Sequence, residues 1–234
     1  MALVDDLIKD GWLKTPKIID AFRKIKRLDF LLALPTGKPE DLEEMAEFNE
    51  ALSIGFNQTI SQPLVVALML ELLEPKQGDK ILDIGSGSGY TSALLGEIAG
   101  QKGKVTAIEI IPELKEFGEK NAEKYGFVKK GIVEFICGDG SKGYKEEAPY
   151  DKILASASVR SGKGIKGIPS AWKEQLKING RIVTPIENSI WLFVKKSERG
   201  DEPSVHLHSS AQEGFVFEET EYPGFAFVPL VSRR

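Results

Sequence analysis

The amino-acid sequence predicts an α/β protein: a doubly wound, mostly parallel sheet with an N-terminal helical cap and antiparallel C-terminal strands. Two observations carry this prediction. From residue 62 onward, apolar strand-like runs alternate with segments of helical periodicity, as in parallel sheets with crossover helices. Beyond residue 185 the chain is β-rich, which favours antiparallel strands added to the same sheet. We expect a single domain over residues 1–234, with the cap in 1–60 and a Rossmann-like core in 61–234.

The cap is expected from short helical patterns. Ile18, Phe22 and Ile25 recur at the spacing of one helix face, which normally packs against a core. A segment with proline and glycine follows and predicts a turn, and an acidic stretch after it predicts a helix with a solvated face. The expected elements are a helix over Pro16–Leu34, a turn over Leu34–Pro39 and a helix over Glu40–Phe48.

The core is expected to alternate helices and strands along the chain. Its helices are predicted over Gln62–Leu73, Tyr90–Ala99, Pro112–Tyr125 and Pro169–Leu176. Its strands are predicted over Lys80–Ile84, Lys104–Ile110, Ile132–Cys137, Tyr150–Ala155 and Gly180–Pro185. The C-terminal strands are predicted over Ser189–Lys196 and Phe225–Val231, with a weaker one over Ser204–Ser209 and an exposed charged turn over Lys195–Glu202.

Composition bounds the classes of function. With 234 residues, 41% of them hydrophobic, and no apolar run of membrane-spanning length, the chain is expected to be globular and, lacking a leader-like start, cytoplasmic. The single cysteine, Cys137, cannot form an intrachain disulfide and is predicted to fill the core. Two histidines offer no zinc cluster, so no metal is expected. A net charge of −4 disfavours nucleic-acid partners, and we expect a monomer.

The most informative segment is Ile81–Tyr90, in which a strand ends in a D-x-G-x-G-x-G loop that leads into a helix. Gly85, Gly87 and Gly89 allow the backbone to turn sharply and to approach a ligand closely, because a Cβ would clash or forbid positive φ. The following helix directs its N-terminal amides toward whatever the loop holds. The alternative is a tight strand-to-helix connection with no ligand.

The spacing of this loop favours S-adenosylmethionine over a dinucleotide. The third glycine comes one residue earlier than in G-x-G-x-x-G, and Asp83 suits a cationic ligand and not a pyrophosphate. Glu109, at the end of the next strand, is placed to bind a ribose diol, and Asp139 to accept a hydrogen bond from an adenine amino group. The candidate cofactor residues are Asp83, Gly85, Ser86, Gly87, Ser88, Gly89, Glu109, Ile110, Asp139 and Gly140.

A second motif, Gln58-Thr-Ile-Ser-Gln-Pro63, precedes the glycine loop. Together with Asp83–Tyr90, Ile108–Leu114, Gly138–Gly140 and the closing Phe227–Leu230, it resembles the protein-L-isoaspartate O-methyltransferase family in order and approximate spacing. The glycine loop is common to many class I methyltransferases, whereas the Thr-Ile-Ser element is much more particular to this family. The resemblance spans residues 46–231.

The resemblance implies methyl transfer from S-adenosylmethionine to the free α-carboxylate of L-isoaspartyl residues in damaged proteins, a repair reaction that proceeds onward through a succinimide. It makes Ser61 and Thr59 the candidate catalytic residues, and the segment Ser156, Ala157 and Ser158 the candidate substrate-binding segment. A hydroxyl at Ser61 would orient the attacking carboxylate by donating a hydrogen bond. From the residues alone, Ser61 is also a good N-cap for the helix that follows.

Three departures from the family pattern lie on the substrate side. Glu47 and Asn49 stand where the family usually has tyrosine and aspartate, and Phe56–Asn57 replaces His-Gly. The segment Ser156–Ile168 is longer, glycine-rich and basic, with Arg160, Lys163 and Lys166, and is either a lid or a solvated loop. The alternatives are therefore a methyltransferase of this lineage that acts on a small molecule, another protein site or RNA, and a non-catalytic module that keeps the fold.

Overall fold

The computed structural model describes residues 2–33, 38–159, 162, 164–197, 208–209, 215–227 and 229–230. Its helices are α1 (Ala2–Lys9), α2 (Pro16–Lys24), α3 (Pro39–Ala46), α4 (Pro63–Leu73), α5 (Tyr90–Ala99), α6 (Pro112–Glu123) and α7 (Ser170–Gln175). Its strands are β1 (Leu52–Ser53), β2 (Thr59–Ile60), β3 (Lys80–Ile84), β4 (Lys104–Glu109), β5 (Val133–Cys137), β6 (Tyr150–Ala155), β7 (Leu176–Ile186), β8 (Ser189–Ser197), β9 (His208–Ser209) and β10 (Phe215–Pro223). Five short 3₁₀ segments include η1 (Arg27–Phe30), η3 (Gly140–Lys142) and η5 (Gly164–Lys166).

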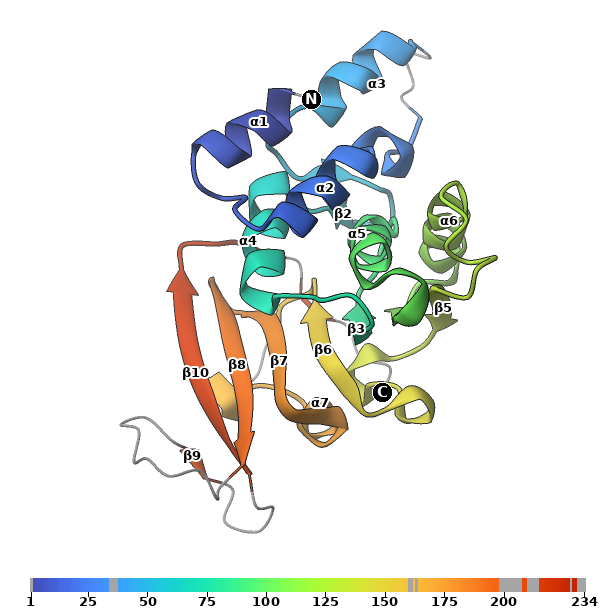
Figure 1. Cartoon of the computed structure of the whole chain (residues 1–234). Helices are drawn as coiled ribbons and strands as arrows, with labels where there is room; N and C mark the ends of the chain where they lie inside the picture. The colour runs from blue at the N-terminus through green and yellow to red at the C-terminus, as the bar shows by residue number, and fades with distance from the viewer. Residues whose placement is uncertain are drawn as a thin grey trace.

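Eight strands form one sheet in the order β5-β4-β3-β6-β7-β8-β10-β9 (Figure 1). The strands from β5 to β7 are parallel, and β8, β10 and β9 each run antiparallel to their neighbour. The chain builds outward from β3 through β4 to β5 and then returns to the other side of β3 with β6. This reversal creates a crevice at the carboxyl ends of β3, β4 and β6, where open α/β sheets bind ligands. The predicted fold class is confirmed.

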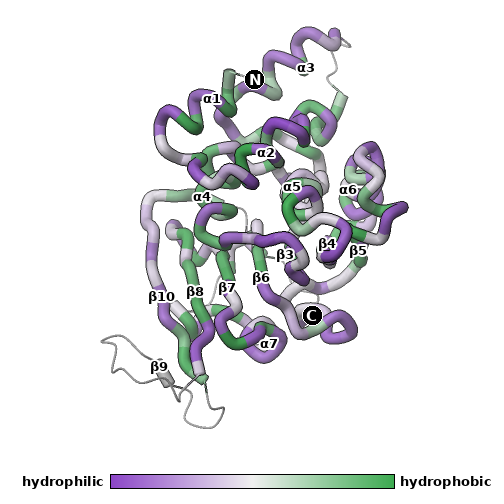
Figure 2. Tube along the Cα trace, in the orientation of Figure 1, coloured by the Kyte–Doolittle hydropathy of each residue, from purple (hydrophilic) through white to green (hydrophobic). Residues whose placement is uncertain are grey.

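Both faces of the sheet are covered, so its central strands are apolar on both sides. Ile81 of β3 faces the cluster that contains α2, α4, α5 and α6, whereas Leu82 faces the cluster that contains Trp172 of α7. Figure 2 shows hydrophobic stretches along β7 and β8, in contrast to the mostly hydrophilic α3. Because alternate residues of β3 point to opposite faces, Asp83 lies on the side of α5.

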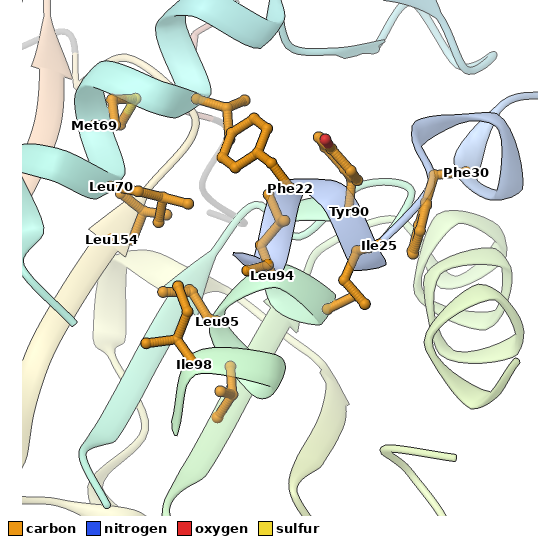
Figure 3. Packing of buried hydrophobic residues seen from close by; sticks show 14 of the residues in the cluster. Phe22, Ile25, Phe30, Met69, Leu70, Tyr90, Leu94, Leu95, Ile98 and Leu154 are labelled. Atoms are coloured by element: carbon orange, nitrogen blue, oxygen red, sulfur yellow. The ribbon is translucent and has the colours of Figure 1, made fainter. Parts of the chain in front are cut away.

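The N-terminal helices α1 to α3 gather at one end of the molecule (Figure 1). Helix α2 packs on α5, and Phe22 of α2 and Phe30 of η1 lie against Tyr90, the first residue of α5 (Figure 3). The Tyr90 ring lies edge-on to Phe22 at 6.2 Å and tilted against Phe30 at 5.3 Å. The cap therefore packs directly on the helix that follows the glycine loop.

Within the cap, the prediction of one helix over Pro16–Leu34 is wrong. Helix α2 ends at Lys24, because Ile25 and Lys26 are extended (φ −89° and −78°), and η1 follows them. This turn brings the side chain of Arg27 into the interior, where it is 5% exposed. The predicted turn at Leu34–Pro39 lies largely outside the described residues, and the acidic helix is present as α3.

The predicted strand over Phe225–Val231 is also wrong for its described residues, 225–227 and 229–230, and β10 is the strand that pairs with β8. Gly224 has φ +99° and ends β10, after which the amides of Gly224 and Phe225 both donate to the carbonyl of Asn188. Of the weaker strand predicted over Ser204–Ser209, only β9 is described.

Two predictions about polar residues fail. The charged turn over Lys195–Glu202 is wrong for its first three residues, which belong to β8. Lys195 is buried, and its ammonium donates to the carbonyls of Lys173 and Leu176 at 2.6 and 2.9 Å. Residues 198–202 lie outside the described part of the chain. Cys137 is exposed and does not fill the core, because β5 is the edge strand of the sheet and Cys137 is its last residue.

Candidate active site

A cavity of about 510 Å³ opens at the carboxyl ends of the central parallel strands. Several parts of the chain form its walls: the residues that follow β5 and β6, the start of α4, the glycine loop, the end of β4, the segment from Gln58 to Gln62 and, last, the segment after β10. This last wall consists of residues 224–227 and 229–230, here termed the C-terminal strap. The cavity thus joins the two motifs that the sequence singles out, although they are separated by a whole helix and strand.

The glycine loop has the backbone geometry that the sequence predicts. Gly85, Gly87 and Gly89 have φ values of +76°, +52° and +84°, which residues with a Cβ rarely adopt. The amides of Gly85 and Ser86 donate to the carbonyl of Ile108 at 2.8 and 3.1 Å, so the loop is held against the end of β4. On the outer side, the Asn121 side chain of α6 donates to the carbonyl of Ser88 at 3.1 Å. The loop is therefore rigidly supported from two directions.

The side chain of Glu109 is bonded to the glycine loop and to the backbone that follows β4. One carboxylate oxygen accepts from the Gly87 amide at 2.9 Å, and the other accepts from the amides of Ile110 and Ile111 at 2.8 and 3.0 Å. Three backbone donors orient the carboxylate at the cavity wall. Its remaining lone pairs can accept from a diol, and the contact with a ribose stays a prediction.

Asp83 is fully buried behind the lining of the cavity. Its Oδ2 accepts from the hydroxyls of Ser92 and Thr91 at 2.6 and 3.0 Å. Burial raises the pKa of this carboxyl to about 6, the negative charge of Glu109 adds to the rise, and the two hydroxyl bonds oppose it. A buried carboxylate with an elevated pKa is stabilised in its charged form by a nearby cation.

Two buried polar atoms at the loop test whether the site fits S-adenosylmethionine. Asp83 Oδ1 and Ser86 Oγ have no hydrogen-bond partner among the described residues, and Ser86 lines the cavity. Unsatisfied buried groups of this kind point to a partner that a ligand supplies. Glu109 on the cavity wall and Asp83 buried behind it supply two carboxylates, and no described residue of the wall is basic, which disfavours a pyrophosphate and suits a cation. The residues present therefore fit this cofactor.

Asp139 is placed differently from the other predicted cofactor residues. Its carboxylate accepts from the amide and hydroxyl of Ser141 at 3.0 and 2.7 Å and caps η3, and it is not part of the cavity lining. The neighbouring Gly138 and Gly140 line the cavity instead. A Cβ on Gly140 would clash with Ile84, so the backbone comes close to β3 at this point. The contact of Asp139 with adenine stays a prediction.

On the opposite wall, Thr59 and Ser61 both line the cavity. Thr59 lies on β2, which pairs with β1 in a hairpin that was not predicted, and its side chain is exposed. The interpretation of Ser61 as the N-cap of α4 is wrong: Gln62 is the N-cap residue, and no side-chain cap hydrogen bond is made. The Ser61 hydroxyl is therefore not needed to start the helix.

Ser156 and Ala157, which follow β6, line the cavity, whereas Ser158 lies behind it. Ser158 instead anchors the C-terminal strap, because its carbonyl accepts from the amide of Leu230 at 2.7 Å. The strap contributes six lining residues that sequence reasoning did not select. The only signal for them was the Phe227–Leu230 motif, which was interpreted as part of a strand.

The basic segment after Ser158 is described only in part. Arg160 and Lys163 lie outside the described residues, and Lys166 is an exposed residue of η5. The amide of Ile165 donates to Glu219 of β10 at 2.8 Å, so η5 is attached to the sheet. In the described part of the chain, no cluster of three or more His, Cys, Asp and Glu side chains is arranged to hold a metal. Nor is any described helix long and apolar enough to cross a bilayer.

Comparisons with known proteins agree with this geometry. Residues 1–221 match the sequence model of the family described as protein-L-isoaspartate(D-aspartate) O-methyltransferase. A protein-L-isoaspartate O-methyltransferase of Methanopyrus kandleri is 36% identical over 233 residues, which cover 98% of this chain and 89% of the relative.

Two solved structures share the fold over 99% of this chain. One, titled protein-L-isoaspartate O-methyltransferase, has a TM-score of 0.77 and 27% identity, and this chain spans 65% of its length. The other is a putative protein-L-isoaspartate O-methyltransferase of Plasmodium falciparum in complex with S-adenosyl-L-homocysteine, with a TM-score of 0.75, 19% identity and 98% of its length covered. Because the family model spans nearly the whole chain, and a relative more than 30% identical is covered along most of its length, the chain belongs to the protein-L-isoaspartate(D-aspartate) O-methyltransferase family.

Proposed function

We propose that the protein transfers a methyl group from S-adenosylmethionine to the free α-carboxylate of L-isoaspartyl residues in damaged proteins. The observation that carries this proposal is one cavity in which the acidic glycine loop faces the Thr59–Ser61 element. When bound, the cofactor supplies a methyl group activated by a sulfonium. The ester formed on the substrate then closes to a succinimide without further help from the enzyme.

In this proposal, the chain's own residues mainly position the reactants. Glu109 holds the ribose, the glycine loop admits the cofactor close to the backbone, and the charge of Asp83 favours its ammonium group. The Ser61 hydroxyl donates a hydrogen bond to the attacking carboxylate, and Thr59 lies on the same wall of the cavity. A carboxylate is already a nucleophile at neutral pH, so alignment and exclusion of water are what the site has to provide.

The apolar part of the cavity wall supports this role. Phe225 and Phe227 of the C-terminal strap line the cavity, with ring centroids 6.5 Å apart. Ile54, Ile60 and Val65 provide apolar surface on the acceptor side. A desolvated carboxylate is a stronger nucleophile than a hydrated one, and these side chains would displace water from it.

We further propose that the protein acts as a monomer in the cytoplasm, on isoaspartyl proteins and not on nucleic acid. A single cysteine suits a reducing compartment, since it forms no intrachain disulfide, and a net charge of −4 gives no general attraction to phosphate backbones.

The deciding experiment incubates the protein with methyl-labelled S-adenosylmethionine and a peptide that contains isoaspartate, beside the same peptide with aspartate. We expect label in the isoaspartyl peptide only, in a form that base hydrolyses. Absence of label above background in that peptide would refute the repair function. Calorimetric binding of the cofactor without transfer to peptide, RNA or lysate would instead indicate a non-catalytic module, and label in RNA or small molecules another acceptor.

A further inference from the structure

One buried cation has no part in the mechanism above. Arg27 of η1 is 5% exposed, and its guanidinium donates to backbone carbonyls from separate parts of the chain. Nη2 reaches Glu50 at 2.6 Å and Ser61 at 3.4 Å, and Nη1 reaches Phe48 at 2.9 Å and Ala46 at 3.4 Å. The segment from Ala46 to Glu50, here termed the 46–50 segment, therefore wraps around a single side chain that also contacts the backbone of Ser61.

The 46–50 segment is in turn bonded to the start of α4. The side-chain oxygen of Asn49 accepts from the Leu64 amide at 3.0 Å, and the side chain of Gln62 donates to the Asn49 carbonyl at 2.8 Å. Asn49 thus supplies an acceptor to an N-terminal amide of α4, whose own N-cap residue, Gln62, makes no side-chain capping bond to the helix. Asparagine at this position retains the acceptor oxygen of the aspartate that the family pattern has there.

We propose that Arg27 is a positioning residue for the acceptor side of the cavity and acts on Ser61 both directly and through Asn49. Two sets of hydrogen bonds connect the guanidinium to residues 61–64. In one, it donates directly to the Ser61 carbonyl; in the other, it holds the 46–50 segment, whose Asn49 is bonded to Gln62 and Leu64. Both routes end at or beside the part of the cavity wall that carries Thr59 and Ser61. The catalytic part of this inference rests on the proposed function.

The chemistry of arginine suits this role better than simple core filling. Burial lowers the pKa of Arg27 to about 10, which records the unfavourable desolvation of its charge. An apolar side chain would fill the same space without that cost. A planar fork of donors can bind several carbonyls in fixed directions, whereas the ammonium of lysine is a point charge with fewer donors.

The test compares Arg27→Lys, Asn49→Ala and Asn49→Asp, with Arg23→Lys as the control. Arg23 is a half-exposed residue of α2 that pairs with Asp5 on the surface and does not line the cavity. Three quantities are measured for each variant: the dissociation constant of S-adenosylhomocysteine, kcat/KM for an isoaspartyl peptide at saturating cofactor, and amide hydrogen exchange of residues 58–64. The exchange measurement needs no activity.

We expect Arg27→Lys and Asn49→Ala to lower kcat/KM by about tenfold or more, because misplacement of a positioning group by even 1 Å is costly. The cofactor dissociation constant should change by less than about twofold, and exchange over 58–64 should accelerate. Asn49→Asp keeps the acceptor and should behave like the wild type, as should Arg23→Lys.

The inference is overturned if exchange over 58–64 is unchanged in both Arg27→Lys and Asn49→Ala, or if cofactor binding and peptide turnover fall in parallel. If Arg27→Lys does not fold, the two Asn49 variants decide alone. If the wild-type protein does not methylate the peptide, the proposed function fails, while the exchange comparison still decides whether Arg27 and Asn49 order this segment.

Discussion

Gly89 of the glycine loop and Gly118 of α6 are in direct backbone contact. A Cβ built on Gly89 would lie 2.6 Å from the carbonyl oxygen of Gly118, closer than Cβ atoms approach other atoms in proteins. A Cβ on Gly118 would lie 2.9 Å from the Gly87 oxygen and 3.1 Å from the Gly89 nitrogen. Helix α6 therefore sets the position of the glycine loop, although none of its residues lines the cavity.

This contact predicts that Gly118→Ala weakens cofactor binding. Gly118 is helical, so alanine suits its backbone, and the added methyl must instead push the loop away from α6. We expect the dissociation constant of S-adenosylhomocysteine to rise by roughly tenfold. Glu116→Ala, on the exposed side of the same helix, is the matched control and should bind normally. Unchanged binding in Gly118→Ala, measured by calorimetry, would show that the loop adapts without loss.

Replacement of Asp83 by asparagine is expected to separate stability from binding. The carboxylate is fully buried and raises the energy of the folded apoprotein at neutral pH, as its pKa of about 6 records. Asparagine keeps an acceptor for Ser92 and Thr91 without the charge. The free energy of unfolding of the apoprotein should rise by up to about 3 kcal/mol, and its melting temperature by a few degrees. Cofactor affinity should fall by roughly tenfold. A melting temperature of Asp83→Asn below that of the wild type, measured by calorimetry, would contradict the prediction that the buried charge destabilises the apoprotein.

The same carboxyl predicts how cofactor binding depends on pH. The pKa of Asp83 is raised from 3.8 to about 6 in the folded protein, so the folded state binds the proton of this carboxyl more tightly than the unfolded state. The resulting contribution to the free energy of unfolding is full below pH 3.8 and is lost as pH rises through about 6. Cofactor binding has the opposite dependence, since only the charged form attracts an ammonium group. We expect S-adenosylhomocysteine affinity to fall between about pH 7 and pH 5. In Asp83→Asn, affinity should be nearly constant over this range; an equal fall would assign the titration to another group.

The sequence predicted best those elements whose boundaries depend on local chemistry. Strand β3, helix α5 and strand β6 have the predicted bounds. A strand that is buried on both faces is an apolar run in the sequence, and glycines stand directly after β3 and on both sides of α5. The failures depend on partners far along the chain. Helix α2 ends earlier than predicted, and Arg27, just after it, donates to carbonyls about twenty residues away in the sequence. The position of the last long strand, β10, depends on its pairing with β8, which begins with Phe215 opposite Ser197. The periodicity of a short segment contains no information about partners that lie far away in the sequence.

The candidate site divides in the same way. Asp83, Glu109 and the glycines come from one strand-loop-helix unit and the end of its neighbouring strand, so their meeting followed from the fold class. The strap reaches the cavity only because Gly224 turns the chain after β10 and Leu230 bonds to Ser158. The bond between Leu230 and Ser158 joins residues 72 positions apart, which explains why the strap was missed while the loop was not.

Replacement of Ser61 by alanine tests whether its hydroxyl orients the acceptor. The structure removes the competing explanation, because Gln62 and not Ser61 is the N-cap of α4 and the side-chain acceptor for this helix comes from Asn49. Ser61→Ala should therefore melt within about 1 °C of the wild type and bind S-adenosylhomocysteine normally. Its kcat for an isoaspartyl peptide should fall by about tenfold to a hundredfold, as for loss of one hydrogen bond made to the reacting group. Ser53→Ala, on β1 and outside the cavity lining, is the matched control and should turn over normally. An undiminished kcat in Ser61→Ala would remove the hydroxyl from the mechanism, whereas equal losses of stability and turnover would assign it a structural role.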